Sequence, residues 1–346
     1  MNSLDALQIA TRQSALDDSD RHGEGDSERF THRLCTQYAT PRELGRVEDV
    51  RIEELSGLAA SRTNRGVLWA VNDSGSPKIY AFKTNGERLG AIHLQGVLTL
   101  NWEALGIGRC GHRECLYIGD IGDDYGVRPW KTIYRVIEPK LDRRIGDTEE
   151  APNYRPFDIF FAEWERFRFV YPGAPSMSTL VDAEAMAIHP NGYAMIATKP
   201  PPGHPTAVYA VELIRNASVI EAQELYRLPW LAGLEQRITG MDIHPSGSTM
   251  LLRSNGRVPP LGRAFEATLN ATGARTHRVQ SVRDVPVANE PQGEAIAYDT
   301  VAGGYYSITE LNGEHHAPIH YAGCADPARE PLRTHGVPLE KHRTGD

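Results

Sequence analysis

Three glutamates occupy matching places in a short pattern that recurs along the chain. The pattern is a small or acidic residue, then Gly or Ala, then a large apolar residue and a mostly small one. Its five copies begin at Ser56, Glu103, Glu184, Thr239 and Glu294. Carboxylates that converge on one axis repel one another unless they are protonated, paired or bound to a cation. Because hard oxygen ligands suit Ca²⁺ or Mg²⁺, the pattern predicts a divalent-metal site at Glu103, Glu184 and Glu294.

A second set of charged residues stands at the ends of the apolar runs that follow the copies. These residues are Asp73, Asp120, Lys199, Arg253 and Glu310. We expect Asp120 to join the glutamates as a metal ligand. Lysine and arginine attract phosphate or carboxylate groups, so Lys199 and Arg253, with Asp73, are predicted to bind an anionic substrate.

Two loops that follow these runs carry further candidates. Trp130 lies in the loop after the second copy, and His315 lies in the loop after the fifth. A histidine beside carboxylates can move protons near neutral pH. We therefore assign catalytic roles to Glu310, His315 and Glu184, and a substrate-binding role to Trp130.

Structural explanations compete with each of these assignments. The glutamates could accept hydrogen bonds from backbone amides of the neighbouring repeat and act as a clasp, or they could act directly as acids and bases. Lys199 and Arg253 could simply pair with nearby acids. The run Gly119–Asp124 resembles a cation-binding loop but lacks the spacing of an EF-hand, so its acids could be ordinary turn residues.

The elements that must position these residues are short strands. Each copy is followed by a second and a third apolar run, such as LWAVND and KIYAF after the first copy, and most copies have a fourth. Four short antiparallel strands repeated five times predict an all-β fold, a β-propeller with five blades. The 81 residues from Glu103 to Glu184 could hide a sixth blade, but the polar segment 138–162 favours an insertion.

The fifth repeat lacks a clear fourth strand, which the segment GRVEDVRI before the first copy can supply. Such an N-terminal strand would close the ring and bring Cys35 towards Cys324, where a disulfide would hold the closure. Cys110 and Cys115 flank a turn and could bridge a hairpin. Free thiols remain the alternative at all four positions.

The composition excludes several classes of protein. The chain has 346 residues and a formal charge of −8, so it is not expected to bind nucleic acid through clustered basic residues. It has no apolar run long enough to span a membrane. The N-terminal segment has no apolar core behind a basic start, so we expect no secretory signal and, by default, a cytoplasmic location. We also expect a monomer. We expect a loose extension at 1–34, one propeller domain at 35–329 and a polar tail at 330–346.

The runs ELSGLAAS, LWAVNDSG, NWEALGIG, LYIGDIGDD, RFVYPGAPSMSTLVDAEAMAI and QGEAIAYD carry a resemblance. Over roughly residues 48–312 the chain resembles a group of bacterial β-propeller proteins that lie near the phytase-like and strictosidine-synthase-like propellers. The resemblance implies a propeller fold. Many proteins of the group are exported, but the N-terminal segment of this chain does not resemble an export signal. It implies no single activity.

The sequence thus predicts a propeller enzyme whose site lies at the mouth of the central channel. We expect a hydrolase or lyase that depends on Ca²⁺ or Mg²⁺ and acts on a small polar, anionic substrate. A non-catalytic propeller that binds a ligand or a protein at the same mouth is the alternative, because the fold alone does not specify function.

Overall fold

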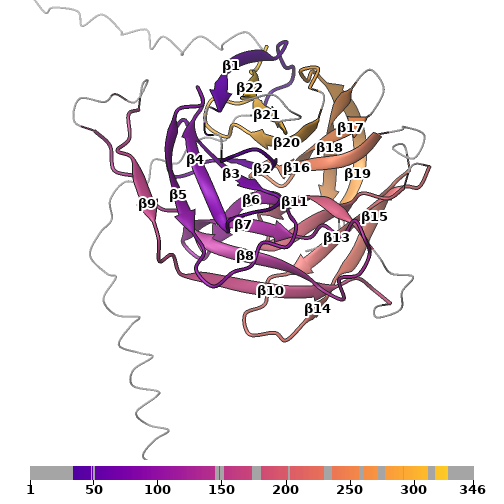
Figure 1. The fold of residues 1–346 in the computed structure, drawn as a ribbon. Coiled ribbons are helices and arrows are strands. Elements are labelled where there is room, and N and C mark those ends of the chain that lie inside the picture. Colours follow the sequence, from indigo (N-terminus) through magenta and orange to yellow (C-terminus); the bar gives the residue numbers. More distant parts are fainter. Residues whose placement is uncertain are drawn as a thin grey trace, which may run out of the picture. The chain divides into compact units, whose positions relative to one another are not determined.

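The computed structural model describes residues 34–47, 49, 51–144, 148, 152–173, 181–201, 203–229, 236–256, 261–271, 277–290, 292–310 and 316–325. These residues form 22 strands in five sheets arranged around a common centre (Figure 1). Each sheet is one blade, so the predicted five-bladed propeller is confirmed. No helix in the described ranges is both long and apolar enough to cross a bilayer.

Blades 1 and 2 each have four antiparallel strands and one short parallel strand at the outer edge. From the centre outwards, blade 1 contains β2 (Leu55–Ala60), β3 (Val67–Asn72), β4 (Lys78–Lys83), β5 (Arg88–His93) and β9 (Phe157–Ile159). Blade 2 contains β6 (Trp102–Cys110), β7 (Arg113–Asp120), β8 (Lys131–Ile137), β10 (Trp164–Val170) and β14 (Ile220–Glu221).

Blades 3, 4 and 5 have four strands each. Blade 3 contains β11 (Ala183–His189), β12 (Tyr193–Thr198), β13 (Thr206–Glu212) and β15 (Gln223–Leu228). Blade 4 contains β16 (Gln236–Ile243), β17 (Thr249–Gly256), β18 (Gly262–Ala271) and β19 (His277–Val285). Blade 5 contains β20 (Gly293–Tyr298), β21 (Tyr305–Thr309), β22 (Ala317–Ala322) and, outermost, β1 (Arg42–Val47).

The ring is closed by the N-terminal strand, as predicted. Strand β1 pairs antiparallel with β22, so the two ends of the propeller share blade 5. Cys35 and Cys324 form a disulfide with their Cα atoms 5.1 Å apart, which we call the closure disulfide. Cys110 and Cys115 form a second bridge across the β6–β7 turn, the hairpin disulfide. No cysteine is left free.

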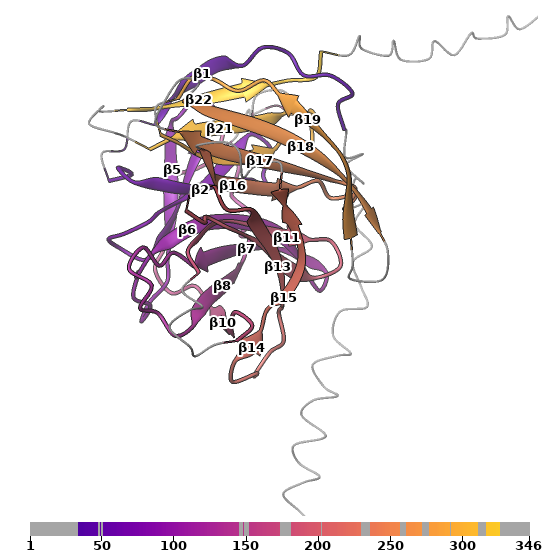
Figure 2. The same cartoon turned by 90° about the vertical axis from the view of Figure 1, so that its right-hand side faces the viewer.

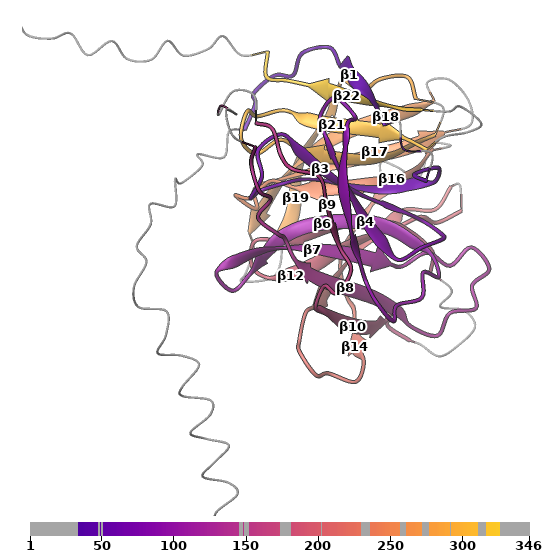
Figure 3. The same cartoon turned by 60° about the vertical axis from the view of Figure 1, so that its left-hand side comes forward.

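The long gap between the second and third repeats holds an insertion and not a sixth blade. The chain leaves β8 at Ile137 and returns at Trp164, and in between β9 pairs with the edge of blade 1 (Figure 3). Similarly, β14 precedes β15 in sequence but pairs with the edge of blade 2 (Figure 2). These short strands cover edges that would otherwise present unpaired backbone groups.

The hydrophobic core lies between neighbouring blades. Trp69 of blade 1 and Trp102 of blade 2 belong to one cluster, and Phe169 of blade 2 and Met186 of blade 3 belong to the next. The inner strands also pack side by side in the order β2, β6, β11, β16, β20 and back to β2. This ring of inner strands fixes the positions of the residues at its centre.

Candidate functional site at the central mouth

Each copy of the sequence pattern begins at a β-bulge near the start of an inner strand. The pairing register of β6 with β7 shifts between Trp102 and Ala104, which leaves Glu103 as the extra residue. The same shift occurs at the other four copies, at Ser56, Glu184, Thr239 and Glu294. A bulge interrupts the alternation of side chains and can direct one of them away from the sheet faces. The repeat therefore brings five polar side chains to the same level of the ring.

The third residue of each copy lies beside a small cavity at the centre of the ring. These residues are Leu58, Leu105, Met186, Met241 and Ile296, and all are buried. Together with bulge residues they line a cavity of about 10 Å³, which is close to the space that one water molecule needs. The centre of the ring is therefore narrow, with polar bulge residues and apolar side chains around the same small cavity.

The two hydroxyl copies bind neighbouring blades to each other. Ser56 Oγ donates a hydrogen bond to the carbonyl oxygen of Trp102, at 2.5 Å, and Thr239 Oγ1 donates to that of Gly293, at 2.9 Å. Each acceptor is the residue just before the bulge of the next blade. A clasp between neighbouring blades thus exists, but hydroxyl groups make it by donating to carbonyl oxygens. Among the glutamate copies, Glu184 pairs with Lys199 and Glu294 accepts a hydrogen bond from Asn255.

Lys199 lies among the carboxyl groups of the mouth. Its ammonium forms an ion pair with Glu184, and both side chains are largely buried. The positive charge of Lys199 also acts to lower the pKa values of Glu103, Glu294 and Glu310, against the larger effect of burial. Lys199 follows β12, and its backbone N–H donates to the Asp182 carbonyl at 2.9 Å. The protein therefore places one cation of its own where the sequence pattern gathers acids.

Burial raises the pKa of several of these carboxyl groups. It raises the pKa of Glu103 well above its ordinary value and that of Glu294 to about 7. The Glu294 carboxylate accepts one hydrogen bond, from Asn255 Nδ2 at 3.0 Å. Groups with a pKa near 7 can both donate and accept a proton at neutral pH.

Asp73 and Glu54 form a second acidic unit at the end of β3. Burial, followed by a hydrogen bond with Glu54, raises the pKa of Asp73 to about 7. Glu54 also accepts a hydrogen bond from Ser74 Oγ. Burial and the charge of Glu54 raise the pKa of Glu310, which accepts a hydrogen bond from Gln292 Nε2 at 2.7 Å. Two carboxyl groups joined in this way share one proton more readily than both ionise.

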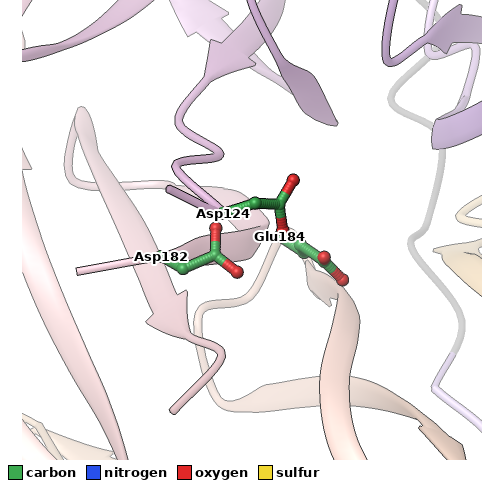
Figure 4. Close-up of side chains that lie close together, drawn as sticks. All are labelled: Asp124, Asp182 and Glu184. Atoms are coloured by element: carbon green, nitrogen blue, oxygen red, sulfur yellow. The ribbon is translucent and has the colours of Figure 1, made fainter. Parts of the chain in front are cut away.

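Asp124, Asp182 and Glu184 form the group of acids best arranged to hold a metal ion (Figure 4). One oxygen atom from each lies within 4.8 Å of the others. Glu184 Oε1 pairs with Lys199, whereas Glu184 Oε2 is buried and has no hydrogen-bond partner among the described residues. Asp182 accepts a hydrogen bond from the Asp123 N–H at 2.9 Å, and burial raises its pKa. We call Asp124, Asp182 and Glu184 the acidic triad.

The other predicted site residues are distributed over several environments. Asp120 is buried and pairs with Arg128 at 2.8 Å, so its carboxylate is already neutralised. Arg253 is fully buried and pairs with Glu290 at 2.8 Å, so its guanidinium is not exposed to a substrate. Trp130 lines a separate groove between blades 1 and 2. His315 lies outside the described residues.

Sequence reasoning did not select Asp124 or Asp182. Asp124 ends the acidic run that was compared with a cation-binding loop, so the run lies in the same segment as one member of the triad. Asp182 stands two residues before Glu184 and immediately before β11. Its closeness to Asp124 depends on how the loop after β7 approaches blade 3, which the repeat does not encode.

The comparisons with known proteins concern the fold. No protein-family model matches the chain, and no curated protein matches it. Among solved structures, a GH43_1 enzyme from Xanthomonas citri complexed with xylose is 14% identical, with a TM-score of 0.45 over 84% of this chain and 92% of that one. An endo-arabinase from Bacteroides thetaiotaomicron is 9% identical, with a TM-score of 0.44 over 81% and 96%. A glucose dehydrogenase is 10% identical, with a TM-score of 0.42 over 83% and 100%.

Proposed function

We propose that the central mouth is the active site of a hydrolase that depends on a divalent cation. One observation carries the proposal: in the part of the chain that the structure describes, Glu184 Oε2 is buried without a hydrogen-bond partner and lies beside Asp124 and Asp182. A buried carboxylate oxygen without a partner is unfavourable unless something compensates its charge. A divalent cation held by the acidic triad would do so.

The donor set of the triad favours Ca²⁺ or Mg²⁺. All three ligands are carboxylates, which these hard cations prefer, and three protein ligands leave positions for water and substrate. When bound, the cation would polarise a substrate oxygen and orient a coordinated water, which a neighbouring carboxylate would deprotonate. The cation would also offset the mutual repulsion of the acids. The proposal thus moves the expected site from the glutamate ring to one side of it.

The remaining carboxyl groups provide proton transfer. Asp73 and Glu294 have pKa values raised to about 7, so either can protonate a leaving group or accept a proton from water. Glu310, on the same rim, would assist them, in line with its predicted catalytic role. Which of the three acts depends on where the substrate lies.

An anionic substrate fits this mouth only when the cation is present. Without the divalent cation, the positive charge of Lys199 is surrounded by acidic side chains, and Arg253 is fully buried, so an anionic substrate would be repelled. With it, the cation and the Lys199 ammonium could hold an anionic group between them. We therefore propose that the substrate is a small, polar anion and that the divalent cation binds before it. Kinship with phytase-like or strictosidine-synthase-like propellers remains a hypothesis.

The compartment is also part of the proposal. Disulfides persist mainly in oxidising environments, and this protein has two. We infer that the enzyme works outside the reducing cytosol. This inference replaces the cytoplasmic default that the N-terminal sequence gave.

Cation binding tests the proposal directly. Ca²⁺ or Mg²⁺ at a hundred times its dissociation constant should stabilise the protein by about 2.7 kcal/mol and raise the melting temperature, and EDTA should reverse the effect. Glu184→Gln and Asp182→Asn should remove the response. Glu224→Gln is the matched control, since Glu224 lies on β15 of the same blade and pairs with Arg227 away from the mouth.

Two outcomes would contradict the proposal. One is a melting curve that neither cation nor chelator changes. The other is a response that survives Glu184→Gln, because the cation would then bind elsewhere. Hydrolysis should be assayed with chromogenic phosphate, carboxylate-ester and glycoside substrates, with and without EDTA, and activity that ignores the chelator would exclude the cation from the reaction.

A further inference from the structure

We propose that a groove between blades 1 and 2 is a second ligand site, specific for a small anionic compound with one ring that has an apolar face. The groove has a volume of about 310 Å³. It is bounded by the loop between β5 and β6, the loop between β7 and β8, and the outer strands β8 and β10. This volume is at the lower end of the range for small-molecule sites.

The floor and one side of the groove are aromatic. Tyr134 on β8 and Trp164 on β10 line it and meet edge to face, with ring centroids 5.7 Å apart. Trp130 lines it from the β7–β8 loop and is 45% exposed. On the other side, Leu98 and Leu100 line the groove and are 76% and 63% exposed. These flat and apolar surfaces suit the face of a ring.

Two arginines give the groove a positive charge. Because side chains alternate along a strand, Trp164, Arg166 and Arg168 project from the same face of β10. Arg166 and Arg168 both line the groove, and Arg168 stacks 5.4 Å from the centre of the Trp130 ring. Within the part of the chain that the structure describes, neither arginine has a carboxylate at ion-pair distance. Arg128, by contrast, is neutralised by Asp120.

The charge of these arginines selects the ligand. Two guanidinium groups without a carboxylate partner among the described residues, in a chain of net charge −8, are complementary to a carboxylate or phosphate, which arginine binds in a bidentate manner. Stacking on Trp130 orients one guanidinium and leaves its edge available. A sugar acid and an aromatic acid share the required chemistry, an anionic group beside an apolar ring face.

The groove and the mouth have opposite charge and should act independently. The mouth gathers carboxyl groups and, under the proposed function, requires a cation before it accepts an anion. The groove requires none. Ligand binding to the groove should therefore persist in EDTA and in Glu184→Gln, so failure of one proposal leaves the other standing.

Calorimetry with two pairs of probes tests the inference. Glucuronate is compared with glucose, and benzoate with benzyl alcohol. At least one acid should bind while its neutral partner does not, and added salt should weaken the binding. Arg166→Gln and Arg168→Gln should each weaken it about tenfold or more, as expected when a hydrogen bond to a charged group is lost. Binding should also change the tryptophan fluorescence, and Trp130→Ala should reduce that change, since Trp164 lines the same groove.

Arg42→Gln is the matched control. Arg42 also lies over an aromatic ring, 6.0 Å from the centre of Tyr321, but belongs to blade 5. Its substitution should leave the affinity unchanged. Equal weakening by Arg42→Gln and Arg168→Gln would overturn the site, as would acids that bind no better than their neutral partners. If a short glutamate peptide binds while neither glucuronate nor benzoate does, the assignment to a small ring compound is wrong.

Discussion

Replacing Glu294 by glutamine should change how the stability of the protein depends on pH. Glu294 is the bulge residue of blade 5, and burial raises its pKa to about 7 from an ordinary value of 4.5. Glutamine has nearly the same shape and can keep a bond to Asn255, but it carries no charge at any pH. The variant therefore isolates the effect of the ionised carboxylate on folding.

The sign follows from linkage between folding and proton binding. Because the folded pKa exceeds the unfolded one, the folded state binds more protons between pH 4.5 and about 7. The stabilisation from the protonated carboxyl group is fully present below pH 4.5 and is lost as the pH rises through 7. At 1.36 kcal/mol per pKa unit, the loss is about 3 kcal/mol. Glu294→Gln avoids this loss. Its free energy of unfolding, relative to that of the wild type, should therefore rise by the same amount between about pH 4.5 and pH 8.

Equilibrium unfolding in guanidinium chloride, with EDTA present, measures the difference at each pH. Glu224→Gln serves as the control, because Arg227 lowers the pKa of Glu224 and its removal should not favour the variant at high pH. A constant difference between wild type and Glu294→Gln across this range would refute the reasoning. It would mean that Glu294 is ionised throughout and that Asn255 and Lys199 compensate its burial fully.

Two further predictions concern the ion pair of the mouth and the closure of the ring. Lys199→Met should destabilise the protein by about 3–5 kcal/mol near neutral pH, because Glu184 is left buried and unpaired. Denaturant unfolding of the double variant Lys199→Met/Glu184→Gln should show a smaller loss of stability than Lys199→Met alone. A larger loss in the double variant would contradict the pairing. Replacing Cys35 and Cys324 by serine should cost roughly 5 kcal/mol in denaturant unfolding, since the bridge spans 289 residues, against roughly 2 for the hairpin disulfide, which spans five. Equal losses would argue against an effect of loop length.

The fold could be predicted because every blade repeats the same physical requirement. An inner strand packed between two neighbours needs small residues beside a large apolar one, so the pattern recurs at a fixed place in each blade. The absence of a fourth strand in the last repeat implied closure by the N-terminus, and pairing of β1 with β22 confirms it. The insertion was recognisable because residues 138–162 are polar and lack the pattern.

The pairing of charges at the site could not be predicted in the same way. Arg253 ends its apolar run like Lys199, yet it is buried against Glu290, which comes from the segment that leads into blade 5. Asp120 pairs with Arg128 because the β7–β8 loop folds back on itself. The strand pattern fixes where a side chain starts, but irregular loops decide which partner it meets.

The bulge position itself argues that the mouth is more than a scaffold. Five equivalent backbone sites precede five equivalent strands, and a hydroxyl there binds the next blade, as Ser56 and Thr239 show. An ionised glutamate cannot donate that hydrogen bond to a carbonyl oxygen. Glu184 of blade 3 pairs with Lys199 instead of making such a clasp. Glu103 and Glu294 of blades 2 and 5 are carboxyl groups whose pKa is raised by burial, and no clasp from either is found among the described residues. Local sacrifices of stability of this kind are expected where side chains are kept for a ligand or a reaction.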